Sequence, residues 1–182
     1  DLWLADGGPP VFVAAGRLVP LKDFPTLLQA LAHVRRRAPA RLLVIGEGPE
    51  RDALLALRAR LGLDEAVEFP GFYEDPLPLF ARAAALVVSS RFEGFGLTLV
   101  EALACGTPVV STDCPTGPAE ILERGAYGRL APVGDADALA RALLETLNAT
   151  PDRERLRQRA QDYTLAAVVE RYLALFDRLE SR

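Results

Sequence analysis

The sequence is poor in the residues that bind transition metals. Its 182 residues include one histidine, two cysteines and no methionine. The two cysteines, Cys105 and Cys114, do not have the C-x-x-C spacing of a zinc motif. We therefore expect a function without a bound metal, and a reduced, cytoplasmic protein.

Long apolar runs are missing as well. No run approaches the 18 or so apolar residues of a membrane span, and the first residues lack the charged and apolar regions of a signal peptide. We therefore expect neither a membrane span nor a signal peptide. Because position 1 is not methionine, we also expect the sequence to be a piece of a longer chain.

Positive charge is in deficit, with a net charge of −4 and a sequence pI of about 5.1. Such a balance implies no extended basic face, so we expect no nucleic-acid partner. Lys22 is the single lysine among 21 basic residues. An anionic ligand would therefore have to be held by a few well-placed cations.

Short apolar runs alternate with segments of helical periodicity along most of the chain. Continuous apolar strands separated by amphipathic helices are typical of parallel strands that are buried on both faces. The sequence therefore predicts one α/β domain over residues 1–182. It should be a doubly wound, Rossmann-like parallel sheet of about six strands with helices on both faces, followed by C-terminal helices. The predicted strands are Val11–Ala15, Leu42–Ile45, Val67–Phe69, Leu86–Ser89, Val109–Ser111 and Arg129–Ala131.

The last predicted helix carries a complete apolar stripe from Leu165 to Leu179 at helical spacing. Two interpretations are open. The stripe packs on its own domain, or part of it covers a second domain that the sequence does not contain.

Ligands of doubly wound sheets bind in the loops at the carboxyl ends of the strands. Arg17 and Lys22 lie in the loop that follows the first predicted strand. A forked guanidinium beside a compact ammonium suits a diphosphate, since one group can bind an oxygen pair and the other supplies a point charge. The alternative is that Lys22 is an ordinary surface charge.

The segment from Glu93 to Glu101 passes from a loop into a helix that is predicted to begin near Leu97. Gly94 and Gly96 allow the backbone to approach a ligand closely. The amides of residues 95–98 are unpaired donors at a helix N-terminus, where anions and hydroxyls bind. Glu101 has apolar neighbours and needs partners, which the two hydroxyls of a ribose could supply. An exposed loop acid at Glu93 and helix charge compensation at Glu101 are the simpler alternatives.

This segment and its continuation to Val110 resemble the signature of the family 4 retaining glycosyltransferases, which have the GT-B fold. The Gly16-Arg17-Leu18 turn with Lys22 resembles the diphosphate-binding loop of the same family. The residues from Ser111 to Leu122 resemble a branch that transfers hexoses or N-acetylhexosamines. The resemblance covers about residues 10 to 150 and includes two further loops, Gly46–Pro49 and Val67–Gly71.

The resemblance implies a role for each matching residue. The family places a nucleoside-diphosphate sugar, with UDP favoured over GDP, in a site that needs no metal and no other cofactor. The implied catalytic residues are Glu93 on the sugar hydroxyls and Arg17 with Lys22 on the leaving diphosphate. The implied donor-binding residues are Gly16, Phe72, Gly94, Phe95, Gly96, Leu97, Thr98 and Glu101. One departure is Asp23, where the family often has glycine.

The resemblance also implies an N-terminal acceptor-binding domain, which the sequence lacks. We therefore expect this part alone to bind a donor weakly and to transfer little or nothing. The whole enzyme would act in the cytoplasm, with peripheral association at the inner face of the membrane as a further option. Two other functions stay open, a nucleotide-binding or regulatory module without catalysis and an NAD-binding domain.

Overall fold

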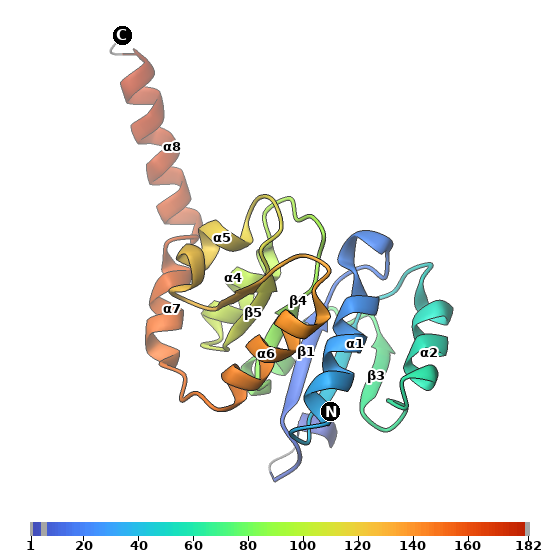
Figure 1. The fold of residues 1–182 in the computed structure, drawn as a ribbon. Helices are drawn as coiled ribbons and strands as arrows, with labels where there is room; N and C mark the ends of the chain where they lie inside the picture. Colours follow the sequence, from blue (N-terminus) through green and yellow to red (C-terminus); the bar gives the residue numbers. More distant parts are fainter. Residues whose placement is uncertain (1, 5–6, 181–182) are drawn as a thin grey trace.

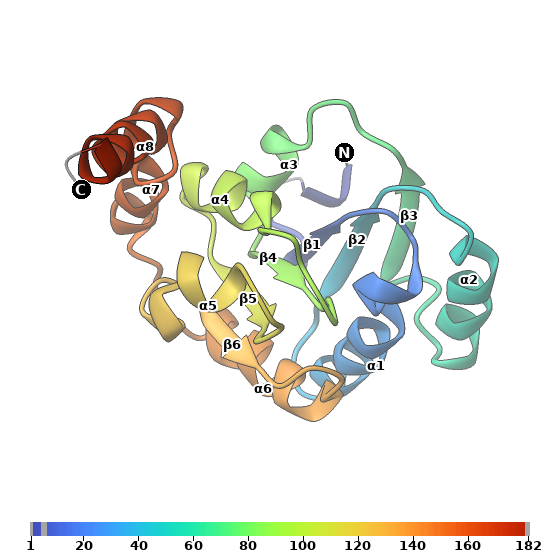
Figure 2. The same ribbon diagram turned by 90° about the horizontal axis from the view of Figure 1, so that it is seen from above.

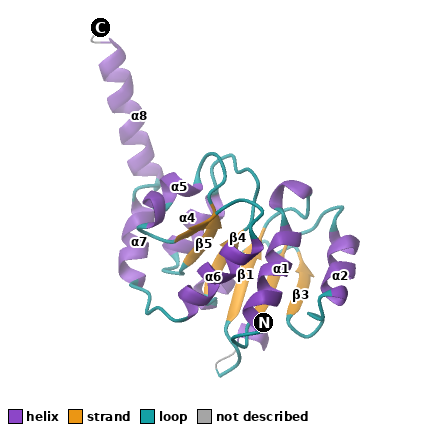
Figure 3. Cartoon of the chain, viewed as in Figure 1, coloured by secondary structure: helices purple, strands orange, loops and turns teal. Residues whose placement is uncertain are grey.

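The computed structural model describes residues 2–4 and 7–180 of the chain. It contains a six-stranded parallel sheet in the order β3-β2-β1-β4-β5-β6, so the doubly wound Rossmann-like fold predicted from the sequence is confirmed (Figures 1 and 3). The strands are β1 (Val11–Ala15), β2 (Arg41–Ile45), β3 (Val67–Gly71), β4 (Ala85–Val88), β5 (Val109–Thr112) and β6 (Arg129–Ala131).

Helices connect the strands and cover both faces of the sheet. The α-helices are α1 (Phe24–Arg35), α2 (Arg51–Arg60), α3 (Leu77–Arg82), α4 (Leu97–Ala104), α5 (Pro118–Ile121), α6 (Ala136–Leu147), α7 (Arg153–Gln161) and α8 (Leu165–Glu180). Short 3-10 turns are η1 (Leu2–Leu4), η2 (Pro20–Lys22) and η3 (Glu123–Gly125). Helices α1, α2 and α6 lie on one face, and α3, α4 and α7 on the other (Figure 2).

Alternation along the strands divides the core into two clusters. Phe12 and Ala14 of β1 belong to the cluster under α1, α2 and α6, whereas Val11 and Val13 belong to the cluster on the opposite face. Successive side chains of a strand point to opposite faces, so an apolar run in a central strand supplies both clusters. This explains why the sequence shows continuous apolar runs in place of polar alternation.

Local chemistry sets several of the helix ends. Aspartate directly before a helical pattern predicts an N-cap at Asp135, and this is confirmed, since its side chain accepts a hydrogen bond from the amide of Ala138 at 2.8 Å at the start of α6. A proline at position 118 and a glycine at position 125 predict one short helix over residues 118–124. This prediction is wrong in part, because the segment is split into α5 and η3, where Glu123 and Arg124 have left-handed φ angles of 44° and 52°.

Helix α8 projects from the body of the domain (Figures 1 and 2). Most of its large apolar side chains are exposed, from 42% at Leu175 to 80% at Leu165, whereas Val168 is half-buried. The interpretation that this stripe packs on its own domain is therefore wrong. Among the described residues, no helix combines the length and the apolar character needed to cross a lipid bilayer.

The exposure of α8 predicts a small effect for substitutions there. Phe176→Ala is expected to change the free energy of unfolding by no more than about 0.5 kcal/mol, since Phe176 is 53% exposed. The matched variant Phe80→Ala removes a fully buried ring and should cost about 3–5 kcal/mol. Urea unfolding followed by circular dichroism would compare them, and similar losses would mean that α8 packs on the domain in solution.

Candidate functional site

The loops that follow β1, β2, β3, β4 and β5 lie at one edge of the sheet, which Figure 2 views from above. Backbone hydrogen bonds connect neighbouring loops. The amide of Leu18 donates to the carbonyl of Glu47 at 2.8 Å, and the amide of Gly46 donates to the carbonyl of Gly71 at 2.8 Å. The amide of Arg91 donates to the carbonyl of Leu21, also at 2.8 Å. The loops therefore form one connected surface.

Two of the predicted catalytic residues meet on this surface. The Nζ atom of Lys22 lies 2.7 Å from Oε1 of Glu93, although the residues are 71 positions apart in the sequence. They meet because β1 and β4 are neighbours in the sheet, so the loops that follow them are adjacent. Glu93 is buried, whereas the Lys22 side chain is 25% exposed and can contact a ligand as well.

The sequence did not single out the residues that hold Glu93 in place. The hydroxyl of Ser90 donates to the same Oε1 atom at 2.5 Å, and the hydroxyl of Thr116 donates to the backbone carbonyl of Glu93. A polar side chain needs such partners when it is buried. Ser90 lies three residues before Glu93, just outside the segment that resembles the family signature, and no local pattern signals the contact from Thr116, which follows the next strand.

Glycines allow the loops to approach each other. A Cβ atom on Gly46 would lie 2.0 Å from the carbonyl oxygen of Gly16, and one on Gly117 would lie 1.9 Å from that of Phe95. Both glycines also have positive φ angles, which side chains rarely adopt. By contrast, a Cβ atom on Gly94 would face open space. The folded chain therefore leaves room beside Gly94, whereas a Cβ atom on Gly96 would lie 2.9 Å from a side-chain carbon of Leu99.

Helix α4 begins directly after this turn. Gly96 occupies the N-cap position with a φ of 93°. Glycine has no side chain, so it cannot cap the helix with a side-chain oxygen. The amides of Leu97 and Thr98 can therefore bind a ligand, as expected of a helix N-terminus, whereas the amide of Leu99 donates to the carbonyl of Gly96 at 2.9 Å. Leu97 is exposed and Thr98 half-buried. The ring of Phe95 packs edge-on against Tyr163, with the ring centroids 5.6 Å apart.

The remaining predicted residues surround this centre. Gly16 lies against the Lys22 side chain, since a Cβ atom on it would be 3.3 Å from Cε of Lys22. Arg17 is exposed, as is Phe72, whose ring is 72% accessible. Glu101 is half-buried on α4, and burial raises the pKa of its carboxyl group. The structure thus brings Gly16, Lys22 and Glu93 into contact and leaves Arg17 and Phe72 accessible on the same edge.

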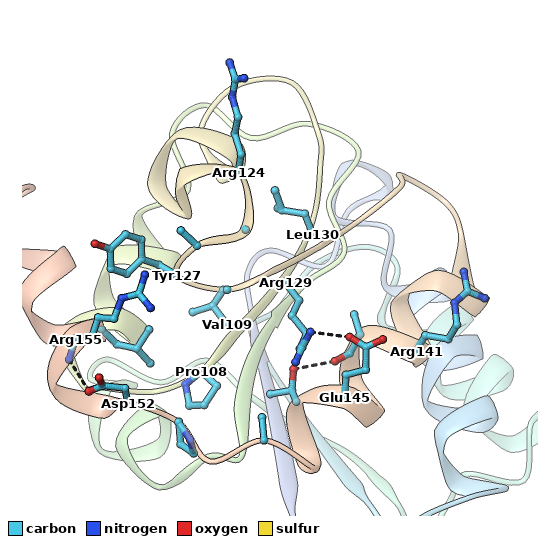
Figure 4. A pocket seen from close by; sticks show the side chains of 18 of the residues that line it. Pro108, Val109, Arg124, Tyr127, Arg129, Leu130, Arg141, Glu145, Asp152 and Arg155 are labelled. Atoms are coloured by element: carbon cyan, nitrogen blue, oxygen red, sulfur yellow. Dashed lines mark hydrogen bonds and ion pairs between the residues drawn. The ribbon is translucent and has the colours of Figure 1, made fainter.

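A separate hollow of about 850 Å³ lies beside the edge strand β6 (Figure 4). It contains none of the predicted site residues. Arg129 in this hollow is paired with Glu145 at 2.6 Å, and the guanidinium of Arg155 lies 4.8 Å from the ring centroid of Tyr127. We place the candidate site at the loop edge, because free helix amides, Lys22 and a buried carboxylate converge there.

Comparison with known proteins assigns the family. Residues 3–163 match the family described as glycosyl transferases group 1, and the chain belongs to this family. The resemblance identified from the sequence is therefore confirmed.

Curated relatives include the lipopolysaccharide core biosynthesis glycosyltransferase LpsE of Rhizobium meliloti, which is 35% identical over 91% of this chain and 49% of its own length. The D-inositol 3-phosphate glycosyltransferase of Nocardia farcinica is 39% identical over 87% of this chain and 36% of its own. The chain thus spans half or less of the length of these relatives.

Solved structures agree with this assignment. The lipopolysaccharide outer core galactosyltransferase WaaB superposes with a TM-score of 0.85 at 26% identity, over 95% of this chain and 50% of its own. The structure of HepE from Anabaena, determined in complex with UDP, superposes with a TM-score of 0.82 at 28% identity, over 100% of this chain and 50% of its own.

Proposed function

We propose that the chain is the donor-binding half of a retaining glycosyltransferase. It would bind a nucleoside-diphosphate hexose or N-acetylhexosamine, with UDP favoured over GDP, for transfer to an acceptor hydroxyl. The observation that carries this proposal is the contact of Lys22 with Glu93 beside the free N-terminus of α4. This arrangement offers a cation, helix amides and a carboxylate to three neighbouring parts of one extended ligand.

The proposed chemistry needs no metal. As the glycosidic bond to the diphosphate breaks, negative charge builds on the departing phosphate oxygen. Arg17, Lys22 and the first amides of α4 would stabilise that charge, and Lys22 is already held at 2.7 Å from Glu93 before the reaction begins. Glu93 would accept hydrogen bonds from the sugar hydroxyls. The departing oxygen would take the proton of an acceptor that attacks from the same face, which retains the anomeric configuration.

Glu101 and Phe72 would hold the nucleoside. A carboxylate accepts hydrogen bonds from two vicinal hydroxyls, so Glu101 suits a ribose. The exposed ring of Phe72 lies in the loop that would meet the base. The relatives are at least about twice as long as this chain. The acceptor would bind beside the loop edge, on a second domain such as that extra length could form. Family membership leaves no reason to prefer an NAD-binding domain.

Calorimetry with the isolated chain tests the proposal directly. UDP should bind in the presence of EDTA, more tightly than GDP, and NAD should not compete with it. Transfer activity of this chain by itself should be absent or very low. If no nucleoside diphosphate binds, the proposal is wrong. The remaining interpretation would then be a module of the same fold that does not bind this class of ligand.

Glu101→Gln should separate binding from stability. Because burial raises the pKa of Glu101, the ionised form is penalised in the folded state. The associated stability is present at low pH and is lost as the pH rises through the raised pKa. We therefore expect Glu101→Gln to raise the thermal midpoint at pH 7 while it weakens UDP binding by about 1–3 kcal/mol.

Thermal unfolding and calorimetry across pH 4 to 8 would check both effects. The wild-type chain should lose affinity as acid protonates Glu101, and the variant should show a flatter dependence. A variant that binds UDP as tightly as the wild type at pH 7 would remove Glu101 from the proposed site.

A further inference from the structure

Asp23 has an unusual backbone for a residue with a side chain. It ends the turn η2 and precedes α1, with φ 47° and ψ 44°, in the left-handed region. This region costs an L-residue roughly 1 kcal/mol or more, although aspartate tolerates it better than most residues. The side chain is nevertheless almost completely buried, at 5% exposure. Since glycine would avoid the cost, the carboxylate itself requires an explanation.

Two ordinary roles fail to explain it. Asp23 occupies the N-cap position of α1, yet its side chain makes no capping hydrogen bond. Its Oδ2 atom lies 3.1 Å from Nη2 of Arg91, close enough for an ion pair but outside hydrogen-bond geometry. Arg91 is 59% exposed, and an ion pair with such a screened partner stabilises a fold only slightly.

The contacts of Asp23 belong to a set that joins two loops of the candidate site. Leu21, Lys22 and Asp23 each contact the loop after β4. The amide of Arg91 donates to the carbonyl of Leu21 at 2.8 Å, and the hydroxyl of Ser89 donates to the carbonyl of Lys22 at 2.8 Å. The third contact of this set is the ion pair between the side chains of Asp23 and Arg91.

Lys22 stands at the centre of these contacts. Its backbone is held by Ser89 and its two neighbours are held by Arg91, while its Nζ atom reaches Glu93 at 2.7 Å. A lysine has four rotatable side-chain bonds, so its ammonium group is placed only as well as its backbone is fixed. The backbone amide and the guanidinium group of Arg91 thus contact the residues on either side of Lys22, which would bind the diphosphate.

We propose that the Asp23–Arg91 ion pair is a positioning element of the donor site. It holds the loop of residues 16–23 against the loop of residues 89–96, so that Lys22 meets Glu93 and the diphosphate of the donor together. This inference rests on the proposed function. The pair also neutralises the Asp23 carboxylate, which would otherwise repel a diphosphate at the neighbouring Lys22.

Binding of UDP and of uridine by variants tests this role, because only UDP carries the diphosphate. Asp23→Asn keeps a residue that tolerates the left-handed backbone, and Arg91→Gln removes the partner charge. Each variant should weaken UDP binding about tenfold and leave uridine binding within about twofold of the wild type. The double variant should lose no more than either single variant, because both changes remove the same interaction.

Two further variants separate positioning from stability. Asp23→Gly relieves the backbone cost but lacks the carboxylate, so its thermal midpoint should equal or exceed that of Asp23→Asn while UDP binding stays weak. The matched control Asp64→Asn breaks an ion pair of the same 3.1 Å length with Arg58, near the C-terminal end of α2. It should leave the binding of both ligands unchanged.

The outcomes distinguish the inference from the function on which it rests. Normal UDP binding by Asp23→Asn, together with a loss in Lys22→Ala, would overturn the positioning role and leave the proposed function intact. Equal losses of UDP and uridine in Asp23→Asn would show a general structural role and would also overturn it. Absence of UDP binding by the wild-type chain would remove the proposed function itself.

Discussion

Gly117→Ala is expected to lower the free energy of unfolding by about 3 kcal/mol or more and to weaken donor binding in the same variant. The new Cβ atom would lie 1.9 Å from the carbonyl oxygen of Phe95, well inside contact distance. The φ of 88° at Gly117 adds backbone strain. Either the loop after β5 or the Phe95 turn must move, and the turn leads directly into α4.

Gly125→Ala is the matched control for this variant. Gly125 has a similar φ of 105°, but a Cβ atom there would meet nothing within 4 Å. It should therefore show the cost of strain alone, about 1 kcal/mol, and bind UDP normally. Chemical unfolding and calorimetry on both variants would measure the difference. Equal stability losses would show that the close approach at Phe95 relaxes at no cost.

Lys22→Ala is expected to produce the largest selective loss of diphosphate binding. Removing a charged hydrogen bond costs about 1.5–3 kcal/mol, which corresponds to roughly 10–100-fold in the dissociation constant for UDP. The loss is increased because the Glu93 carboxylate, whose side chain is 10% exposed, would face the diphosphate without a cation between them. Uridine, which has no phosphate, should bind nearly as before. Equal losses for UDP and uridine would contradict a diphosphate role for Lys22.

A double variant separates the two contributions. Lys22→Ala alone leaves a buried carboxylate without its cation and should therefore also reduce stability. Adding Glu93→Gln removes the unpaired charge, so the thermal midpoint should recover. UDP binding should stay weak, since the ammonium group is still absent. Recovery of UDP binding in the double variant would show that repulsion by Glu93 was the main cause of the loss.

Local chemistry made much of the fold predictable. Apolar runs, helical periodicity and the Asp135 cap are properties of neighbouring residues, so they identify elements before the chain folds. The α5 segment shows the limit of this approach, since the left-handed backbone at Arg124 interrupts a helix that its sequence pattern favours. Helix α8 shows another limit. Its stripe predicted burial against some surface, but the pattern carries no information about which surface that is.

The sequence by itself determined the parallel α/β sheet, the loop edge at which we expect a ligand to bind and the group of candidate residues around Lys22, Glu93 and Glu101. Only the tertiary structure decided which of these residues touch. The contact of Lys22 with Glu93, the support from Thr116 and the pairing of Asp23 with Arg91 each join loops that follow different strands. Such contacts depend on the order of strands in the sheet, which places β4 beside β1. Hydrophobic periodicity is a local property and does not encode that order, so only the folded chain could reveal these contacts.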